Sequence, residues 1–342
     1  MSRRRVTLAD VARRAGLSTT AASMILNGRP DTRLSEDAHR RVHAAAAELG
    51  YRPNVAARGL RTAKTLTIGF VSDLVATTRF ASGLIKGALE AAENAGHVVL
   101  VAETGGDPKR EGEAIAALLD RQVDGVIFAV MRARELFVPE LPEGTDAVML
   151  NATNARHPAA VLPDEEPGGR AAVRLLVEAG HAEGIALIGQ SDEAEGDVFR
   201  STTVARRVAG IRGAMADHGL EFVAEKSIWQ WEPQHGYTST MELLRQCPDV
   251  RALICMNDRL AFGAYQAVTE AGLRIPDDIS IVSFDNDEVT AYLRPGLTTI
   301  ALPHEAMGRR AVDLLLGDEP GAETLVPMPV VERASIGPPR GR

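Results

Sequence analysis

The sequence predicts an α/β protein, in which a small all-α head precedes a body of two similar α/β halves built on parallel sheets. Three observations support this class. The first 50 residues contain three capped helical stretches and no strand pattern. From Leu66 onward, short β-rich apolar runs alternate with helical stretches, which is typical of parallel sheets covered by helices. The alternation starts again near Gly168, so we expect two lobes with a cleft between them.

The head follows the order helix, tight turn, helix, supporting helix. Thr7 can cap the first helix, with Asp10 three residues later to return the hydrogen bond. Gly16 ends that helix, and Ser18 caps the second after a short turn. Ser35 caps the third, whose first turn is acidic, as the helix dipole favours. This is the helix-turn-helix pattern, although a plain helical bundle would share it.

Charge favours a nucleic-acid interface over a plain bundle. Residues 1–64 contain 13 Lys and Arg against 5 Asp and Glu, whereas residues 65–342 contain 25 against 41. A basic head on an acidic body is expected of a domain that contacts phosphate while the body is repelled from it.

Residues 7–18, 23–27 and 48–62 resemble, in this order, the head of the LacI/GalR family of bacterial repressors. The resemblance implies that the second helix lies in the major groove of DNA. It also implies a hinge helix at residues 54–61, which packs against its dimer mate and opens the minor groove. Our hypothesis is that the free hinge is disordered and folds only on operator DNA.

Several head and hinge positions correspond to the family's DNA contacts. Thr19 and Thr20 fall on base-reading positions, and both can donate and accept hydrogen bonds. Leu60 corresponds to the hinge leucine that wedges into a base step. Met24 stands where the family often has Arg, and Met cannot hold guanine bidentately, so the sequence does not support an inherited operator preference. Gly59 is a second departure, at a position where the family usually has Ser or another side chain. The resemblance assigns DNA contacts to Thr7, Ser18, Thr19, Thr20, Ser23, Met24, Asn27, Asn54, Ala57 and Leu60.

The sequence of residues 65–342 predicts strands that alternate with helices. The expected strands are 66–72, 97–103, 123–130, 147–150, 185–190, 227–229, 251–256, 279–284 and 297–300, with an extended stretch at 325–333. The expected helices are 81–95, 109–122, 168–180, 204–218, 237–245, 260–272 and 305–316.

Residues 204–215, 254–286 and 294–303 resemble the sensor domain of the same family, which is similar to type I periplasmic binding proteins. The resemblance implies that the last strand and helix cross back to the first lobe. The expected domains are a DNA-binding head at 1–52, a hinge helix and linker at 53–64, and an effector-binding and dimerisation domain at 65–342. Its lobes are expected at about 65–160 plus 291–322, and 161–290 plus 323–342.

Polar groups at strand ends, with an aromatic platform, indicate the effector site. Asn257 and Asp285 each follow a strand, and their amide and carboxylate suit hydroxyl or ring N–H groups. Arg207 corresponds to the family's ligand-binding arginine, whose guanidinium offers a planar fork. Asp258 is expected to cap the helix that follows it. The resemblance assigns effector contacts to Phe80, Ser201, Thr203, Arg207, Trp231, Asn257 and Asp285.

The effector that fits this set best is a sugar or sugar derivative, because an aromatic platform with Arg, Asn and Asp suits a polyhydroxyl compound. A nucleobase or nucleoside also fits an aromatic ring with Asp and Arg. No feature of the sequence separates these two ligand classes.

Other classes of protein receive little support. The chain contains no G-x-S-x-G, H-E-x-x-H, P-loop or G-x-G-x-x-G pattern, so we expect no enzyme, cofactor or metal site. It shows no signal peptide or membrane-spanning run, and Cys247 and Cys255 are expected as thiols, so we expect a cytoplasmic protein. An exported solute-binding protein, or a sugar-acting α/β enzyme with an incidental helical head, remains the alternative.

The sequence thus predicts a sequence-specific transcriptional regulator, a repressor, that binds a pseudo-palindromic operator as a homodimer. A small-molecule effector between the lobes would control operator affinity through its different affinities for two conformations. Whether the effector induces or co-represses stays open.

Overall fold

The computed structural model describes residues 6–27, 34–51, 64–79, 81–190, 202–317 and 321–339. The chain divides into two compact units, Met1–Leu66 and Thr67–Arg342, and each is described by itself. The predicted hinge helix lies outside the described residues. No described helix is both long enough and apolar enough to span a membrane.

The described residues of the head unit form the three helices predicted there: α1 (Leu8–Ala15), α2 (Thr19–Leu26) and α3 (Glu36–Leu49). The Thr7 hydroxyl accepts a hydrogen bond from Asp10 N at 3.3 Å, and the Asp10 carboxylate accepts one from Thr7 N at 3.0 Å. Gly16 ends α1 with a left-handed conformation at φ 67°. Val11, Ile25 and Val42 meet in the head's core, which holds the three helices together.

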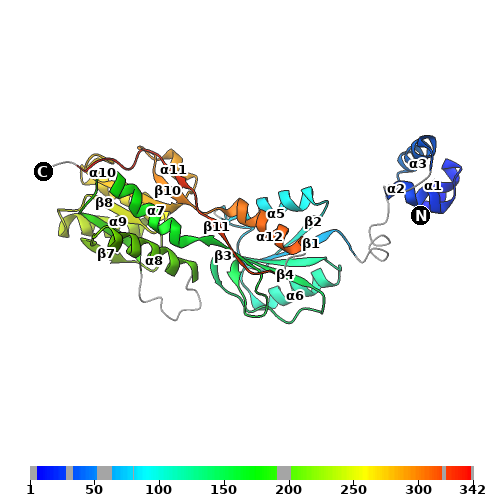
Figure 1. Ribbon diagram of the computed structural model, residues 1–342, viewed down its shortest axis with the longest axis horizontal. Coiled ribbons are helices and arrows are strands. Elements are labelled where there is room, and N and C mark those ends of the chain that lie inside the picture. Colours follow the sequence, from blue (N-terminus) through cyan, green and yellow to red (C-terminus); the bar gives the residue numbers. More distant parts are fainter. Residues whose placement is uncertain are drawn as a thin grey trace. The chain divides into compact units, whose positions relative to one another are not determined.

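The body contains two six-stranded sheets, one in each lobe (Figure 1). The first sheet has the order β11-β5-β4-β3-β1-β2, with all its strands parallel. The second has the order β12-β10-β9-β8-β6-β7, and only β12 is antiparallel. The first-sheet strands are β1 (Thr67–Ser72), β2 (Val98–Glu103), β3 (Gly125–Glu135), β4 (Asp146–Thr153), β5 (Ala160–Asp164) and β11 (Glu323–Pro327). The second-sheet strands are β6 (Ile185–Gln190), β7 (Ala224–Ser227), β8 (Ala252–Cys255), β9 (Ser280–Asp285), β10 (Thr298–Ala301) and β12 (Val330–Val331).

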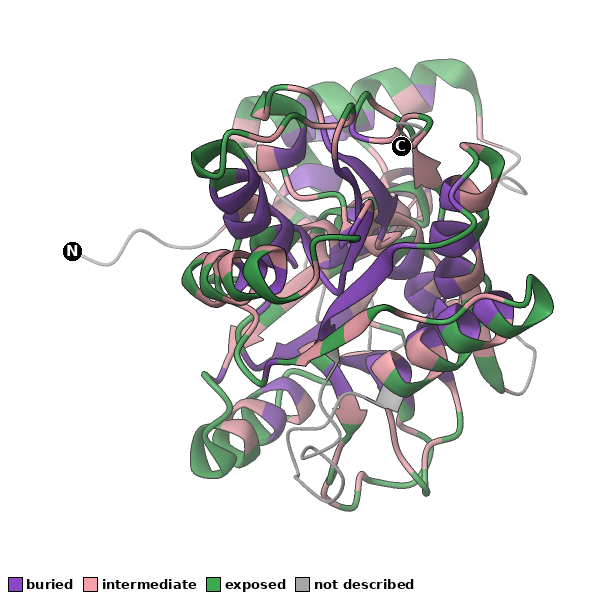
Figure 2. Cartoon of the chain, turned by 90° about the vertical axis from the view of Figure 1, so that its left-hand side faces the viewer, coloured by how far each residue is buried: buried purple, intermediate pink, exposed green. Residues whose placement is uncertain are grey.

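Helices cover both sheets and bury the strands between them (Figure 2). In the first lobe, successive strand residues face opposite sides, so Phe70 packs with α5 and α12 while Val71 packs with α6. The first lobe contains α5 (Ser82–Asn94), α6 (Pro108–Leu119) and α12 (His304–Leu316). The second contains α7 (Glu165–Glu178), α8 (Thr202–Asp217), α9 (Pro233–Gln246), α10 (Asp258–Glu270) and α11 (Val289–Tyr292).

The strands near the lobe boundaries correct the predicted division of the body. β10 was expected in the first lobe, but it pairs with β9 in the second sheet. β11 was expected in the second lobe, but it pairs with β5 in the first. β5 itself, at 160–164, was assigned mainly to the second lobe and also belongs to the first. Only the last helix, α12, returns to the first lobe as expected, where it packs on α5. Short apolar strands carry no sequence signal for the sheet they join, which explains these errors.

Two glycines let α7 and α8 approach closely, and this contact brings the effector site together. A Cβ added at Gly169 would lie 2.2 Å from Arg207 O, and one at Gly210 would lie 2.1 Å from Glu166 O. Only glycine fits such backbone contacts. The approach places the start of α7 directly against the Arg207 segment of α8.

We expect Gly210→Ala to lower the free energy of unfolding of the body by roughly 1–3 kcal/mol, because its Cβ forces two backbones apart. Urea unfolding followed by circular dichroism measures this change. Gly112→Ala is the matched control, since Gly112 lies in α6 with nothing within 4 Å of its added Cβ. It should be neutral or stabilise by about 0.4–1 kcal/mol. Equal effects of the two substitutions would show that the close backbone contact is not what makes Gly210 necessary.

Candidate functional site

A cleft of about 1570 Å³ is lined by residues of both lobes. Five of the predicted effector residues meet there: Thr203, Arg207, Trp231, Asn257 and Asp285. They come from the carboxyl ends of second-sheet strands and from the helices that follow, where open α/β sheets bind ligands. The other two, Phe80 and Ser201, lie outside the described residues.

Arg207 is a buried part of this site, with 2% of its surface exposed. Its Nε and Nη2 donate to the two oxygens of Glu165 at 2.6 and 2.8 Å, and Nη1 donates to Met256 O at 2.6 Å. Its guanidinium also lies over the Phe284 ring, 4.3 Å from the centroid. Burial alone would lower the pKa of Arg207, but the Glu165 carboxylate outweighs burial and raises it. Arg207 is therefore charged and held in one position.

Glu165 is the main site residue that the sequence did not reveal. Its side chain is 2% exposed and forms a fork-to-fork ion pair with Arg207. It begins α7 directly after β5, and a carboxylate in the first turn is favoured by the helix dipole. The only available signal was an acidic pair, residues 165–166, after a strand, and many surface helices start in the same way.

Asp285 supplies the carboxylate at the end of β9. Burial raises its pKa well above the usual range; Arg207 lowers it, whereas Asp258, Glu165 and Asp287 raise it further. In the described residues, no hydrogen bond to its carboxylate is found. Asp285 also has a φ of 109°, a left-handed conformation that non-glycine residues rarely adopt. Such strain is often found at binding sites.

The residue that caps α10 is Asn257, whereas the sequence predicted Asp258. The Asn257 side chain caps α10 by accepting from Leu260 N at 2.8 Å, so Asp258 is not the cap. Asp258 is fully buried and accepts hydrogen bonds from Ser283 and from Thr299, the latter at 2.8 Å. Burial raises the pKa of Asp258 to about 6, although these hydrogen bonds act in the opposite direction. Asp258 thus ties α10, β9 and β10 together beneath the cleft.

Two tryptophans line the second-lobe side of the cleft. The indole N–H of Trp231 donates to Gly189 O at 2.7 Å and to Ile228 O at 3.2 Å, which fixes the ring. Trp229 also lines the cleft and is 45% exposed. Both rings are available as platforms, and the predicted Trp231 is the more firmly held.

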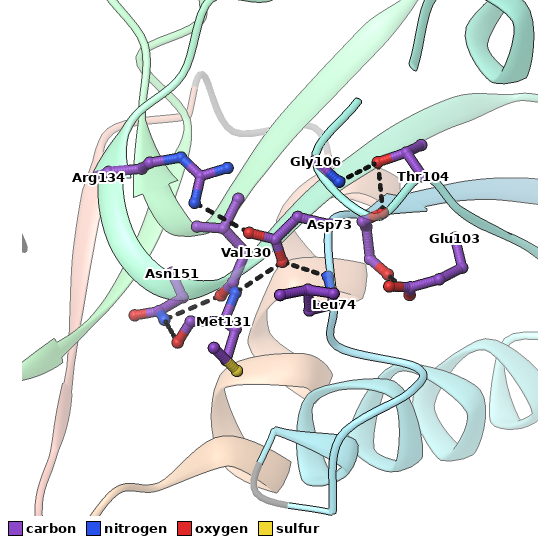
Figure 3. Close-up of polar contacts among 10 residues, drawn as sticks. Asp73, Leu74, Glu103, Thr104, Gly106, Val130, Met131, Arg134 and Asn151 are labelled. Atoms are coloured by element: carbon purple, nitrogen blue, oxygen red, sulfur yellow. Dashed lines mark hydrogen bonds and ion pairs between the residues drawn. The ribbon is translucent and has the colours of Figure 1, made fainter. Parts of the chain in front are cut away.

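The first-lobe wall of the cleft is held by a buried polar network (Figure 3). The Asp73 carboxylate accepts from Met131 N at 3.0 Å and from Arg134 at 2.9 Å. The Asn151 amide donates to Val130 O and to Met131 O, at 3.0 and 3.1 Å. β3 shifts its register against β4 at this point, so these bonds fix an irregular segment that faces the cleft. Sequence patterns did not indicate this network.

Exposed ion pairs join the lobes, and one of them lies at the cleft. Arg79 of the first lobe donates to Glu288 of the second, and both line the cleft. The Arg79 side chain is 90% exposed, so this pair contributes at most about 1 kcal/mol to lobe closure.

The second predicted site is the exposed face of α2 in the head. Ser18 Oγ caps α2 by accepting from Ala21 N at 3.1 Å, while Thr19 and Thr20 are exposed in its first turn. Thr7 is exposed as well, and Ser23, Met24 and Asn27 are partly exposed along α2 and at its end. Asn27 donates to Ser23 O at 2.6 Å, which leaves its side-chain oxygen for a partner. The hinge residues Asn54, Ala57 and Leu60 lie outside the described residues.

Comparisons with known proteins match both units of the chain. The family of bacterial regulatory proteins of the lacI type matches residues 7–54, and a periplasmic binding protein-like domain matches residues 173–336. The chain is 32% identical over 317 residues to the HTH-type transcriptional repressor PurR of Klebsiella pneumoniae, covering 91% of this chain and 89% of that protein. The chain belongs to the lacI family.

Other members of the lacI family show the same similarity. The ribose operon repressor of Escherichia coli is 30% identical over 318 residues, which cover 91% of this chain and 92% of that protein. A lac repressor dimer bound to operator and the anti-inducer ONPF superposes with a TM-score of 0.75 at 28% identity, covering 97% of this chain and 99% of that one.

The lacI-family assignment confirms the predicted fold class and the function as a DNA-binding transcriptional regulator controlled by a small molecule. These three relatives are repressors rather than enzymes. The individual DNA and effector contacts remain predictions, because the comparisons identify no residue of this chain as a ligand contact.

Proposed function

We propose that the chain is a homodimeric repressor that binds a pseudo-palindromic operator in the cytoplasm. When an effector enters the cleft, the repressor either releases the operator or binds it more tightly. The observation that carries this proposal is the convergence of Arg207, Trp231, Asn257 and Asp285 in one cleft of a chain that also carries a helix-turn-helix head. An effector bound between the lobes would stabilise one arrangement of the lobes. The change in operator affinity would be set by the difference between the effector's affinities for the two arrangements.

We propose that the effector is a polyhydroxyl compound of the sugar or nucleoside type, bound without chemical conversion. The cleft combines a fixed tryptophan with amide, carboxylate and guanidinium groups, which suits hydroxyl groups on a ring. The similarity to a ribose operon repressor is compatible with a ligand that contains a sugar ring.

Selection of bound DNA from a random pool tests the operator proposal. We expect a pseudo-palindrome with half-sites about one helical turn apart, because two heads read DNA through two-fold symmetry. A flexible central step would support insertion of Leu60, since wedged side chains unstack such steps. The selection is repeated with sugars and nucleosides present, in case the effector is a co-repressor. Recovery of no preferred sequence in either condition would overturn the proposal.

A further inference from the structure

Carboxyl groups outnumber cationic groups on the floor of the cleft among the described residues. Glu165 and Asp285 line the cleft together with one guanidinium, that of Arg207, and Asp258 lies beneath them in hydrogen bonds to Ser283 and Thr299. Arg207 and Glu165 are each 2% exposed and pair through two hydrogen bonds, so they neutralise one another. Asp285 also lines the cleft, and Arg207, the cation that acts on it among the described residues, is already neutralised by Glu165. Burial raises the pKa of Asp285, so the effector-free site favours its neutral form, and a ligand cation beside it would favour the carboxylate.

The pairing also determines which edge of Arg207 a ligand can reach. A guanidinium can bind a carboxylate or phosphate bidentately through its Nε–Nη2 edge or its Nη1–Nη2 edge, and Glu165 already occupies the first. Nη1 is used by Met256 O. An anionic ligand would therefore be left with the Nη1–Nη2 edge, where it would lie next to Glu165 and Asp285. Repulsion by two carboxylates disfavours such a ligand.

The arginines around the cleft do not reverse this balance. Arg132 is exposed at the first-lobe side, where water screens its charge. Four other arginines of the rim pair with carboxylates: Arg79 with Glu288, Arg259 with Glu232, Arg212 with Glu225, and Arg309 with Glu90 and Glu305. The rim is thus close to neutral, and Asp285, the carboxyl group without a paired cation in the described part of the chain, lies on the floor.

The aromatic rings of the cleft also favour a positively charged ligand. Trp229 and Trp231 both line the cleft, and the face of an indole ring attracts cations. The indole N–H of Trp231 is directed to backbone carbonyls, so its ring face remains for the ligand.

We propose that the effector is a polyhydroxylated amine, such as an amino sugar or aminonucleoside, whose ammonium group lies against Asp285. This inference rests on the proposed function, because it concerns the ligand of the same cleft. The ammonium group would pair with Asp285 and hold it in its ionised form, while Asn257 and the Nη1–Nη2 edge of Arg207 bind ring hydroxyls. Glu165 then sets the charge preference of the site by occupying the Nε–Nη2 edge of Arg207.

Matched ligand sets test the proposal by calorimetry on the full chain. Each set contains an amine, its neutral parent and its carboxylate: glucosamine, glucose and glucuronate; galactosamine, galactose and galacturonate; 5′-amino-5′-deoxyadenosine, adenosine and adenosine 5′-carboxylate. We expect one amine to bind about tenfold or more tightly than its neutral parent, since a charge-assisted hydrogen bond contributes about 1.5–3 kcal/mol. Its carboxylate should bind more weakly still. Equal affinity within every set, preference for a carboxylate, or binding by none of the compounds would overturn the proposal.

Variants assign the preference to the floor of the cleft. Asp285→Asn should reduce the amine-to-parent ratio to about one, because it removes the carboxylate that the ammonium contacts. Glu288→Gln is the matched control at the rim and should retain the ratio, since Glu288 is already paired with Arg79. Loss of the ratio in Glu288→Gln alone would place the preference at the rim and overturn the proposal. Asp285→Asn keeps the size and shape of the side chain, so the variant should fold. Glu165→Gln is not used as a test, because it would leave the buried charge of Arg207 unpaired.

Operator binding separates this inference from the proposed function. If mobility shifts on the selected operator respond to a neutral sugar and not to any amine, the repressor function stands and the amine proposal falls. If an amine binds tightly but no operator is found, the ligand proposal stands and the repressor proposal falls.

Discussion

Replacing Arg207 with methionine should lower the free energy of unfolding of residues 67–342 by about 3–5 kcal/mol, because it leaves a buried Glu165 charge unpaired. The double variant Arg207→Met with Glu165→Leu should recover most of that loss, since well-packed apolar side chains can replace a buried ion pair at little cost. Urea unfolding of the full chain and of both variants measures the difference. Both variants should lose the response to effector.

The neighbouring Arg206 provides the matched control. It pairs with Glu323 at 2.8 Å, but both side chains are 39% exposed. Arg206→Met should therefore cost about 1 kcal/mol or less. If Arg206→Met and Arg207→Met cost the same, or if the double variant is as unstable as Arg207→Met, the buried pair is not the cause.

Replacing Asp285 with asparagine should stabilise the effector-free protein and abolish its response to effector. The native carboxylate is costly because burial raises its pKa well above the usual range. Asparagine removes this cost, and it also tolerates the positive φ of 109° better than most residues. A substitution that gains stability while losing function is typical of binding sites.

The pH dependence of this stabilisation follows from the direction of the pKa shift. Below the ordinary pKa of an aspartate, Asp285 is protonated in the folded and unfolded chains, so Asp285→Asn gains nothing from ionisation. As pH rises, the unfolded chain loses the proton first, and the native protein loses stability until the folded-state pKa is reached. The advantage of Asp285→Asn should therefore grow by about 1.4 kcal/mol for each pH unit between those two values and then level off.

Thermal and urea unfolding between pH 4 and 8 measure this difference. Asp313→Asn is the control, because Asp313 is exposed on α12 and its substitution should change the free energy of unfolding by about 0.5 kcal/mol or less. An advantage of Asp285→Asn that stays constant or shrinks as pH rises would show that the carboxylate is not held in its protonated form by the fold.

The features that the sequence predicted correctly, such as helix ends and strand-end polar residues, are determined by residues close together in the chain. The head helices begin at Thr7, Ser18 and Ser35, and α1 ends at Gly16, because caps act within one turn. Strand-end polar residues were also predictable, since Asn257 and Asp285 follow apolar runs that can only be strands in an α/β pattern.

Long-range pairing accounts for what the sequence did not reveal. Glu165 and Arg207 are 42 residues apart, and their contact depends on the close approach of α7 and α8. The choice of sheet for β10 and β11 depends likewise on pairing across the lobes. Asn257 and Asp258 are adjacent and both buried, and the exact start of α10 decides which of them caps it. A difference of one residue lies within the error of sequence patterns.

The placement of the tryptophans gives this protein a built-in optical reporter. The chain contains 2 tryptophans in all, and both line the cleft. The intrinsic tryptophan fluorescence of the whole molecule therefore comes from rings beside the effector, with no background from the head or the first lobe. An effector that covers Trp229, which is 45% exposed, removes it from water and should shift its emission to shorter wavelength. Ligand screening then needs neither a label nor a known operator.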